Sequence, residues 1–136
     1  MWGGYGEIAR RFPRIPVEQE RELIARAKRG SRKSRDELVL RHVGFVMFRL
    51  HRKVFPQHLR RHGPDLLAAS IPVLYEKIKS YNLDYRDRAG NPRPVKFSSY
   101  IWKRIDGFII DSIKKEVAQE GAVLSYSPSL ARNFPS

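Results

Sequence analysis

The chain has 136 residues, of which 27 are lysine or arginine and 14 are aspartate or glutamate, so its formal net charge is +13. The absence of cysteine excludes a disulfide scaffold, a thiol nucleophile and every zinc site that needs cysteine. No apolar run approaches the roughly 20 residues that span a bilayer, so we expect no membrane partner. A compact domain with this charge repels itself unless an anionic partner offsets it. We therefore expect a cytoplasmic, nucleoid-associated protein that binds a polyanion.

Apolar residues recur at helical spacing through most of the sequence, which predicts an all-α fold, a compact bundle of four or five helices. The first expected helix covers residues 17–29. The second should start at a Ser34 cap, with Glu37 as its capping-box partner, and continue to Val54. Its buried stripe is expected to contain Val39, Val43, Val46 and Leu50.

Prolines mark the next boundaries. Pro56 should stop the second helix, and residues 57–63 should form a basic link that contains two histidines. A third helix should start at Pro64 or Asp65, with a bend or a break just before Pro72, because an interior proline removes a hydrogen bond. The apolar stripe of this helix is expected to contain Leu67, Ile71, Leu74, Ile78 and Tyr81.

Turn-forming residues fill positions 82–95 and predict a loop. A fourth helix should begin at Ser98 or Ser99 and fade near Glu116. Beyond Gly121 the residues are small, polar and interrupted by proline, which is typical of a tail. We accordingly divide the chain into an N-terminal arm (1–16), a helical domain (17–118) and a flexible C-terminal tail (119–136).

Aromatic and cationic residues alternate from this loop into the fourth helix. Aromatic rings stack on bases at about 1–3 kcal/mol each while cations hold the phosphates, so the pattern is typical of a single-stranded nucleic-acid site. Trp102 lies about 100° round the helix from an inward-facing Ile101, so we expect it to be partly exposed. Tyr81 and Phe97 are expected in the core. The full set is Tyr81, Tyr85, Arg86, Arg88, Lys96, Phe97, Tyr100, Trp102, Lys103 and Arg104.

Two other functions stay open on the residues alone. Asp84, Asp87 and Asp106 could gather round a magnesium ion in a small nuclease. A structural basic protein would instead bind duplex and single strands alike. His58 and His62 have helical spacing, but a zinc ion needs more ligands than they supply. We expect no metal, no cofactor and no enzymatic activity.

The chain also resembles a known family. Residues 96–100 (K-F-S-S-Y) and the following R-I, G and I-I-D at residues 104–111 are similar to the promoter-melting segment in region two of bacterial sigma-70 family factors. Within that family the motif most resembles the flagellar and general-stress alternative sigmas. Residues 65–67 (D-L-L) resemble the start of another region-two helix, and residues 35–46 the helix that opens the region. Residues 5–23 resemble the segment that precedes it.

This resemblance implies a transcription initiation factor that binds core RNA polymerase at the coiled-coil clamp of its β′ subunit. It also implies capture of the melted non-template strand of the promoter minus-ten element, with Tyr100 in the stacking position of a flipped-out adenine. The implied DNA-binding residues are Arg86, Arg88, Lys96, Phe97, Ser98, Ser99, Tyr100, Trp102, Lys103, Arg104, Gly107, Ile110, Asp111 and Lys114. The implied polymerase-binding residues are Asp65, Leu66, Ala68, Ala69, Pro72, Val73 and Glu76.

The sequence departs from the family at several points, among them the position of Trp102 and a longer loop at residues 84–95. Ala68 and Ala69 replace a polar Gln-Glu pair that binds polymerase, and Pro72 follows, so a sigma-derived DNA-binding adaptor without normal polymerase docking stays open. Asp106 stands where many relatives have arginine, which would put a negative charge near DNA. No match to the reader of the minus-thirty-five element follows. The chain would then be a fragment, or a stand-alone region-two protein that works with a second polypeptide; an anti-sigma protein is a further candidate partner.

Overall fold

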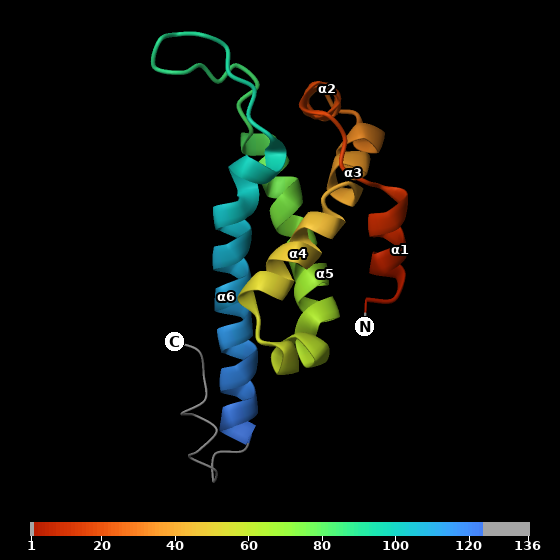
Figure 1. Ribbon diagram of the computed structural model, residues 1–136, viewed down its shortest axis with the longest axis vertical. Coiled ribbons are helices and arrows are strands. Elements are labelled where there is room, and N and C mark those ends of the chain that lie inside the picture. Colours follow the sequence, from red (N-terminus) through yellow and green to blue (C-terminus); the bar gives the residue numbers. More distant parts are fainter. Residues whose placement is uncertain (1, 124–136) are drawn as a thin grey trace.

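The computed structural model of the chain describes residues 2–123. These residues form six helices, with no strand beyond an isolated bridge between Arg86 and Pro92 (Figure 1). The expectation of an all-α fold is confirmed. In chain order the helices are α1 (Gly4–Arg11), α2 (Val17–Lys28), α3 (Arg32–Leu40), α4 (Val43–Lys53), α5 (Pro56–Ser80) and α6 (Phe97–Val123).

The two longest helices, α5 and α6, lie side by side, and α4 packs against both of them (Figure 1). Helices α2 and α3 pair with each other, and both contact α5. The expected apolar stripes meet in one core, where each fully buried side chain of this size contributes about 1.5–3 kcal/mol. Its fully buried members include Ile24, Leu38, Val46, Leu50, Leu67, Leu74, Phe97, Ile101, Ile105 and Ile109.

The helix expected from Ser34 onward is two helices, α3 and α4, and the predicted Ser34 cap is wrong. Ser31 is the cap, because its hydroxyl oxygen accepts a hydrogen bond from the Ser34 N–H at 3.2 Å. Gly30, at φ 104°, makes the left-handed turn that places Ser31 there. The break between α3 and α4 falls at His42, whose ring Nδ1 bonds the Leu38 carbonyl oxygen at 2.8 Å.

Prolines shape α5 differently from the prediction. Pro56 lies in the first turn of the helix, where its missing N–H has no partner to lose, so the expected link after it is helical. The helix then continues through Pro64 and Pro72 without the expected break. Each proline leaves a carbonyl oxygen four residues earlier without an N–H donor. Arg60 and Ala68 stand at those positions and are exposed, so water can bond their carbonyls.

Helix α6 extends past Glu116 to Val123, so the part of the expected tail that the structure describes is helical. The extension packs on the start of α5. His62 Nε2 lies 2.7 Å from a Glu120 oxygen, and Arg61 Nε forms an ion pair with the same oxygen at 2.9 Å. Residues 124–136 of that tail lie outside the described residues.

The expected N-terminal arm contains a helix of its own. Helix α1 packs against α4, where Gly44 faces Ala9: a Cβ at Gly44 would lie 3.5 Å from the Ala9 Cβ, an ordinary van der Waals contact. Over residues 2–123, no helix combines the length and the apolar character that crossing a membrane requires.

Candidate functional site

The first turns of α6 place their residues alternately in the core and at the surface. Phe97 and Ile101 are fully buried, and Tyr81 packs beside Phe97 with ring centroids 6.1 Å apart, so the prediction that Tyr81 and Phe97 are core residues is confirmed. Phe97 therefore cannot touch a ligand directly, contrary to its place in the implied DNA-binding set. Trp102 is 39% exposed, which confirms its expected partial exposure.

Two cations border the Trp102 ring. The Arg49 guanidinium carbon lies 5.6 Å from the ring centroid, and the Lys103 ammonium lies 5.5 Å from it. A shallow hollow of about 330 Å³ adjoins the ring and is lined by Phe45, Arg49, Ser98, Ser99 and Trp102. An exposed aromatic face beside two cations and two hydroxyls can stack on a base and bind a phosphate at the same time.

Asp106 does not present its charge to the surface as the sequence suggested. It is 5% exposed and forms a two-point ion pair with Arg49, in which Arg49 Nε donates to Oδ1 at 2.8 Å and Nη2 donates to Oδ2. Lys53 adds a third contact at 3.9 Å. The bond to Asp106 raises the pKa of Arg49. The Asp106 charge is therefore paired with Arg49 inside the bundle, and Asp106 orients Arg49 beside Trp102.

The Arg49–Asp106 ion pair also matters for the alternative of a magnesium-dependent nuclease. Asp106 is held by Arg49 inside the bundle, whereas Asp84 and Asp87 lie in the loop before α6. Asp87 is itself occupied, since its Oδ1 accepts a hydrogen bond from the Asn91 N–H at 3.0 Å. Over residues 2–123, no three histidine or acidic side chains gather in a way that could hold a metal ion.

Tyr100 is half-buried and held in one orientation. Its hydroxyl lies 2.9 Å from the Ser80 carbonyl oxygen and 2.8 Å from the Ser80 hydroxyl, both at the end of α5. Its ring meets Tyr81 edge to face, with centroids 5.4 Å apart. The Lys77 ammonium lies 4.3 Å from the Tyr100 ring centroid. The tyrosine is therefore already oriented before any ligand arrives.

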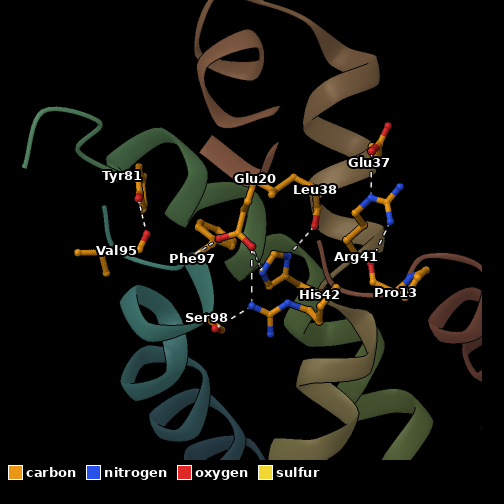
Figure 2. A network of polar contacts seen from close by, with 11 residues as sticks. Pro13, Glu20, Glu37, Leu38, Arg41, His42, Tyr81, Val95, Phe97 and Ser98 are labelled. Atoms are coloured by element: carbon orange, nitrogen blue, oxygen red, sulfur yellow. Dashed lines mark hydrogen bonds and ion pairs between the residues drawn. The ribbon is translucent and has the colours of Figure 1, made fainter. Parts of the chain in front are cut away.

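The start of α6 is fixed from α2 by a buried carboxylate (Figure 2). Glu20 accepts a hydrogen bond from the Phe97 N–H, one of the donors that a helix N-terminus leaves without a partner. Arg14, in the segment before α2, donates to the Ser98 hydroxyl at 3.0 Å and lies 3.7 Å from a Glu20 oxygen. The N-terminal segment thus positions the turn that carries Tyr100 and Trp102.

Glu20 also faces a buried histidine. Its Oε2 lies 3.6 Å from His42 Nε2, and Nε2 has no hydrogen-bond partner. Burial raises the pKa of Glu20, outweighing the Phe97 N–H, Arg14 and Lys96, which lower it. Burial lowers the pKa of His42 to about 4, so its ring is neutral and Nδ1–H donates to the Leu38 carbonyl.

The loop before α6 projects from the end of the bundle (Figure 1). Arg86 helps to fold it, donating to the Gly90 carbonyl oxygen at 3.0 Å, while Gly90 takes φ 83° in the turn. Arg88, Lys96 and Tyr85 are exposed. All three predicted cations of this segment are thus exposed, and Arg86 is also hydrogen-bonded within the loop.

The remaining predicted DNA-binding residues follow one another along the outer surface of α6. Most of their side chains are exposed, and Ile110 is half-buried. They are Lys103, Arg104, Gly107, Ile110, Asp111 and Lys114.

The predicted polymerase-binding residues of α5 divide between two faces. Leu66 and Val73 are buried in the core, so they support the helix and cannot reach a partner. The others are exposed and spaced along one side at intervals of three or four residues: Asp65, Ala68, Ala69, Pro72 and Glu76.

Sequence reasoning missed the contribution of α4 and Lys77. A hollow of about 400 Å³ lies between α1 and α4, beside the Trp102 hollow, with Phe12, Phe45 and Phe48 in its wall. The Arg14 and Arg41 guanidiniums lie 5.8 Å from the Phe45 and Phe12 ring centroids, respectively. The sequence signal was the spacing of Phe45, Phe48 and Arg49 on the side of α4 away from Val46 and Leu50.

Comparison with known proteins identifies no relative of this chain. The chain matches no protein-family model, no curated protein and no solved structure.

Proposed function

We propose that the chain is a sigma region-two-like factor that captures one strand of melted promoter DNA and docks on core RNA polymerase. The observation that carries this proposal is the exposed Trp102 ring between Arg49 and Lys103, close along α6 to the fixed Tyr100. The ordered resemblance of residues 5–116 to the sigma-70 family supports the same interpretation.

In this proposal the aromatic rings stack on unpaired bases. Each stacked base contributes about 1–3 kcal/mol, which offsets the cost of removing it from a duplex. Lys103, Arg104 and the exposed loop cations bind the phosphates. The hydroxyls of Ser98 and Ser99 border the hollow beside Trp102 and supply hydrogen bonds to the strand.

The aromatic residues provide the decisive test. We expect Trp102→Ala or Tyr100→Ala to weaken binding of a fluorescent single-stranded or forked minus-ten oligonucleotide by about 5- to 150-fold, the effect of removing one stacked base. Fluorescence anisotropy measures this. Phe55→Ala is the control, because Phe55 is an exposed aromatic residue at the start of α5. Wild-type affinity in both site variants would refute strand capture.

The cations should act differently. Lys103→Ala or Arg104→Ala should weaken binding to every sequence equally and lower the dependence of log affinity on log salt by about 0.7 for each phosphate that is no longer neutralised. A titration of the same oligonucleotides over a range of salt concentrations measures this slope. A sequence-dependent loss of affinity with an unchanged slope would show that these side chains do not contact phosphate.

Polymerase docking is proposed for the exposed side of α5. Asp65 and Glu76 carry its charges, so Glu76→Lys should abolish co-elution with core RNA polymerase on a sizing column at physiological salt. The sigma-derived adaptor is the second candidate, favoured by Ala68 and Ala69, which expose methyl groups on this side and offer no polar contact. Failure of the wild-type chain to co-elute, with fork binding intact, would favour the adaptor.

A further inference from the structure

Lys77 stands where a stacking base would have to go. It lies on α5, three residues before Ser80, and its ammonium is 4.3 Å from the Tyr100 ring centroid. The hydroxyl bonds to Ser80 and the edge-to-face contact with Tyr81 fix the direction of the Tyr100 ring. The ring therefore cannot simply rotate to offer another face, and a base that stacks on this face must displace the ammonium.

The displaced Lys77 ammonium can bind the phosphate of the stacked nucleotide. A nucleotide stacked on Tyr100 brings its own phosphate within a few ångströms of the ring edge, and the lysine side chain has four rotatable carbons. Lys77 is half-buried, so its carbon stem is already supported while its charged end is free to move. The cation that lies over the ring in the free protein is thus placed to bind the phosphate of the base that replaces it.

We propose that Lys77 is a further strand-binding residue, which covers the Tyr100 ring when the site is empty and pairs with the phosphate of the stacked nucleotide when it is filled. This inference rests on the proposed capture of a single strand at Tyr100. It assigns Lys77 to positioning of the strand and leaves the stacking itself to Tyr100.

The test compares Lys77→Met with Lys79→Met. Methionine keeps a flexible apolar stem and removes the charge. Lys79 is the matched control, because it is an exposed lysine two positions along α5, about 200° round the helix from Lys77. The probe is a single-stranded minus-ten oligonucleotide with 2-aminopurine at the unpaired adenine. Its fluorescence is quenched on stacking, and its affinity is measured over a range of salt concentrations.

We expect Lys77→Met to weaken binding about two- to five-fold at low salt, the range for one exposed ion pair, and to lower the salt slope by about 0.7. Quenching at saturation should stay at the wild-type level, because Ser80 and Tyr81 still orient the ring. Lys79→Met should change neither the slope nor the quenching.

Three results would overturn the inference. Tighter binding of Lys77→Met with an unchanged slope would mean that Lys77 only blocks the ring. Equal behaviour of Lys77→Met and Lys79→Met, with binding still weakened in Tyr100→Ala, would exclude the role of Lys77 and leave strand capture intact. Unchanged binding and quenching in Tyr100→Ala would exclude the role of Lys77, and unchanged binding in Trp102→Ala as well would refute the proposed function.

Discussion

Glu20→Ala should lower the free energy of unfolding by about 3 kcal/mol, whereas Glu20→Gln should leave it unchanged or raise it. Alanine leaves the Phe97 N–H buried without a partner and opens a cavity where the Glu20 side chain was. Glutamine keeps the bond to α6, since its carbonyl oxygen can accept from the Phe97 N–H, and its amide can donate to His42 Nε2, which has no partner in the wild type. Urea denaturation of the three proteins at neutral pH measures the difference.

The pH dependence of this difference gives a second readout. The folded protein holds the Glu20 proton more tightly than the unfolded chain, because burial raises the pKa of Glu20 above its ordinary 4.5. The wild type therefore loses stability as pH rises from 4.5 through the raised pKa, and Glu20→Gln does not. The free energy of unfolding of Glu20→Gln should exceed that of wild type above the raised pKa, and the two values should become equal in acid.

Titration of His42 changes stability in the opposite direction, both in wild type and in Glu20→Gln. Its lowered pKa means that stability is lost as pH falls from 6.5 towards about 4, so this loss cancels in the comparison. A Glu20→Gln variant less stable than wild type at every pH would show instead that Glu20 is buried as a charged partner of Arg14.

Asp106→Ala should also cost about 3 kcal/mol of stability, because it leaves the mostly buried Arg49 guanidinium without its two-point partner. Replacing both partners with apolar residues, in Arg49→Met with Asp106→Leu, should recover most of the loss, since no unpaired charge remains. Thermal unfolding of the single and double variants completes a mutant cycle.

An exposed ion pair provides the control for this cycle. Glu22 and Arg26 pair on the surface of α2, with both side chains more than half exposed, so Glu22→Ala should change stability little. A cost of Asp106→Ala equal to that of Glu22→Ala would show that the Arg49 pair contributes no more than a surface pair. Asp106→Ala should also lower strand affinity if the carboxylate orients Arg49 beside Trp102.

Local pattern was sufficient to predict much of the fold and part of the candidate site. The all-α class, the buried stripes of α4, α5 and α6, and the exposure of Trp102 follow from helical periodicity, since a helix that buries Ile101 and Ile105 must turn Trp102 outward. The alternation of aromatic and cationic residues along residues 81–104 likewise needs only the sequence. These features depend only on residues that are close together in the sequence, so the sequence alone is enough to predict them.

Contacts between distant residues were not predictable in this way. Glu20 lies 77 positions from Phe97, whose N–H donates a hydrogen bond to it, and Arg49 lies 57 positions from Asp106. A carboxylate is expected at the surface until packing removes it from water and supplies its partner. The passage of α5 through two prolines has the same origin, because exposure of Arg60 and Ala68 decides whether water replaces the missing hydrogen bonds. Packing of α6 against α4 and α5, with Glu20 of α2 at its start, therefore places Tyr100 against the end of α5 and Trp102 beside Arg49 of α4.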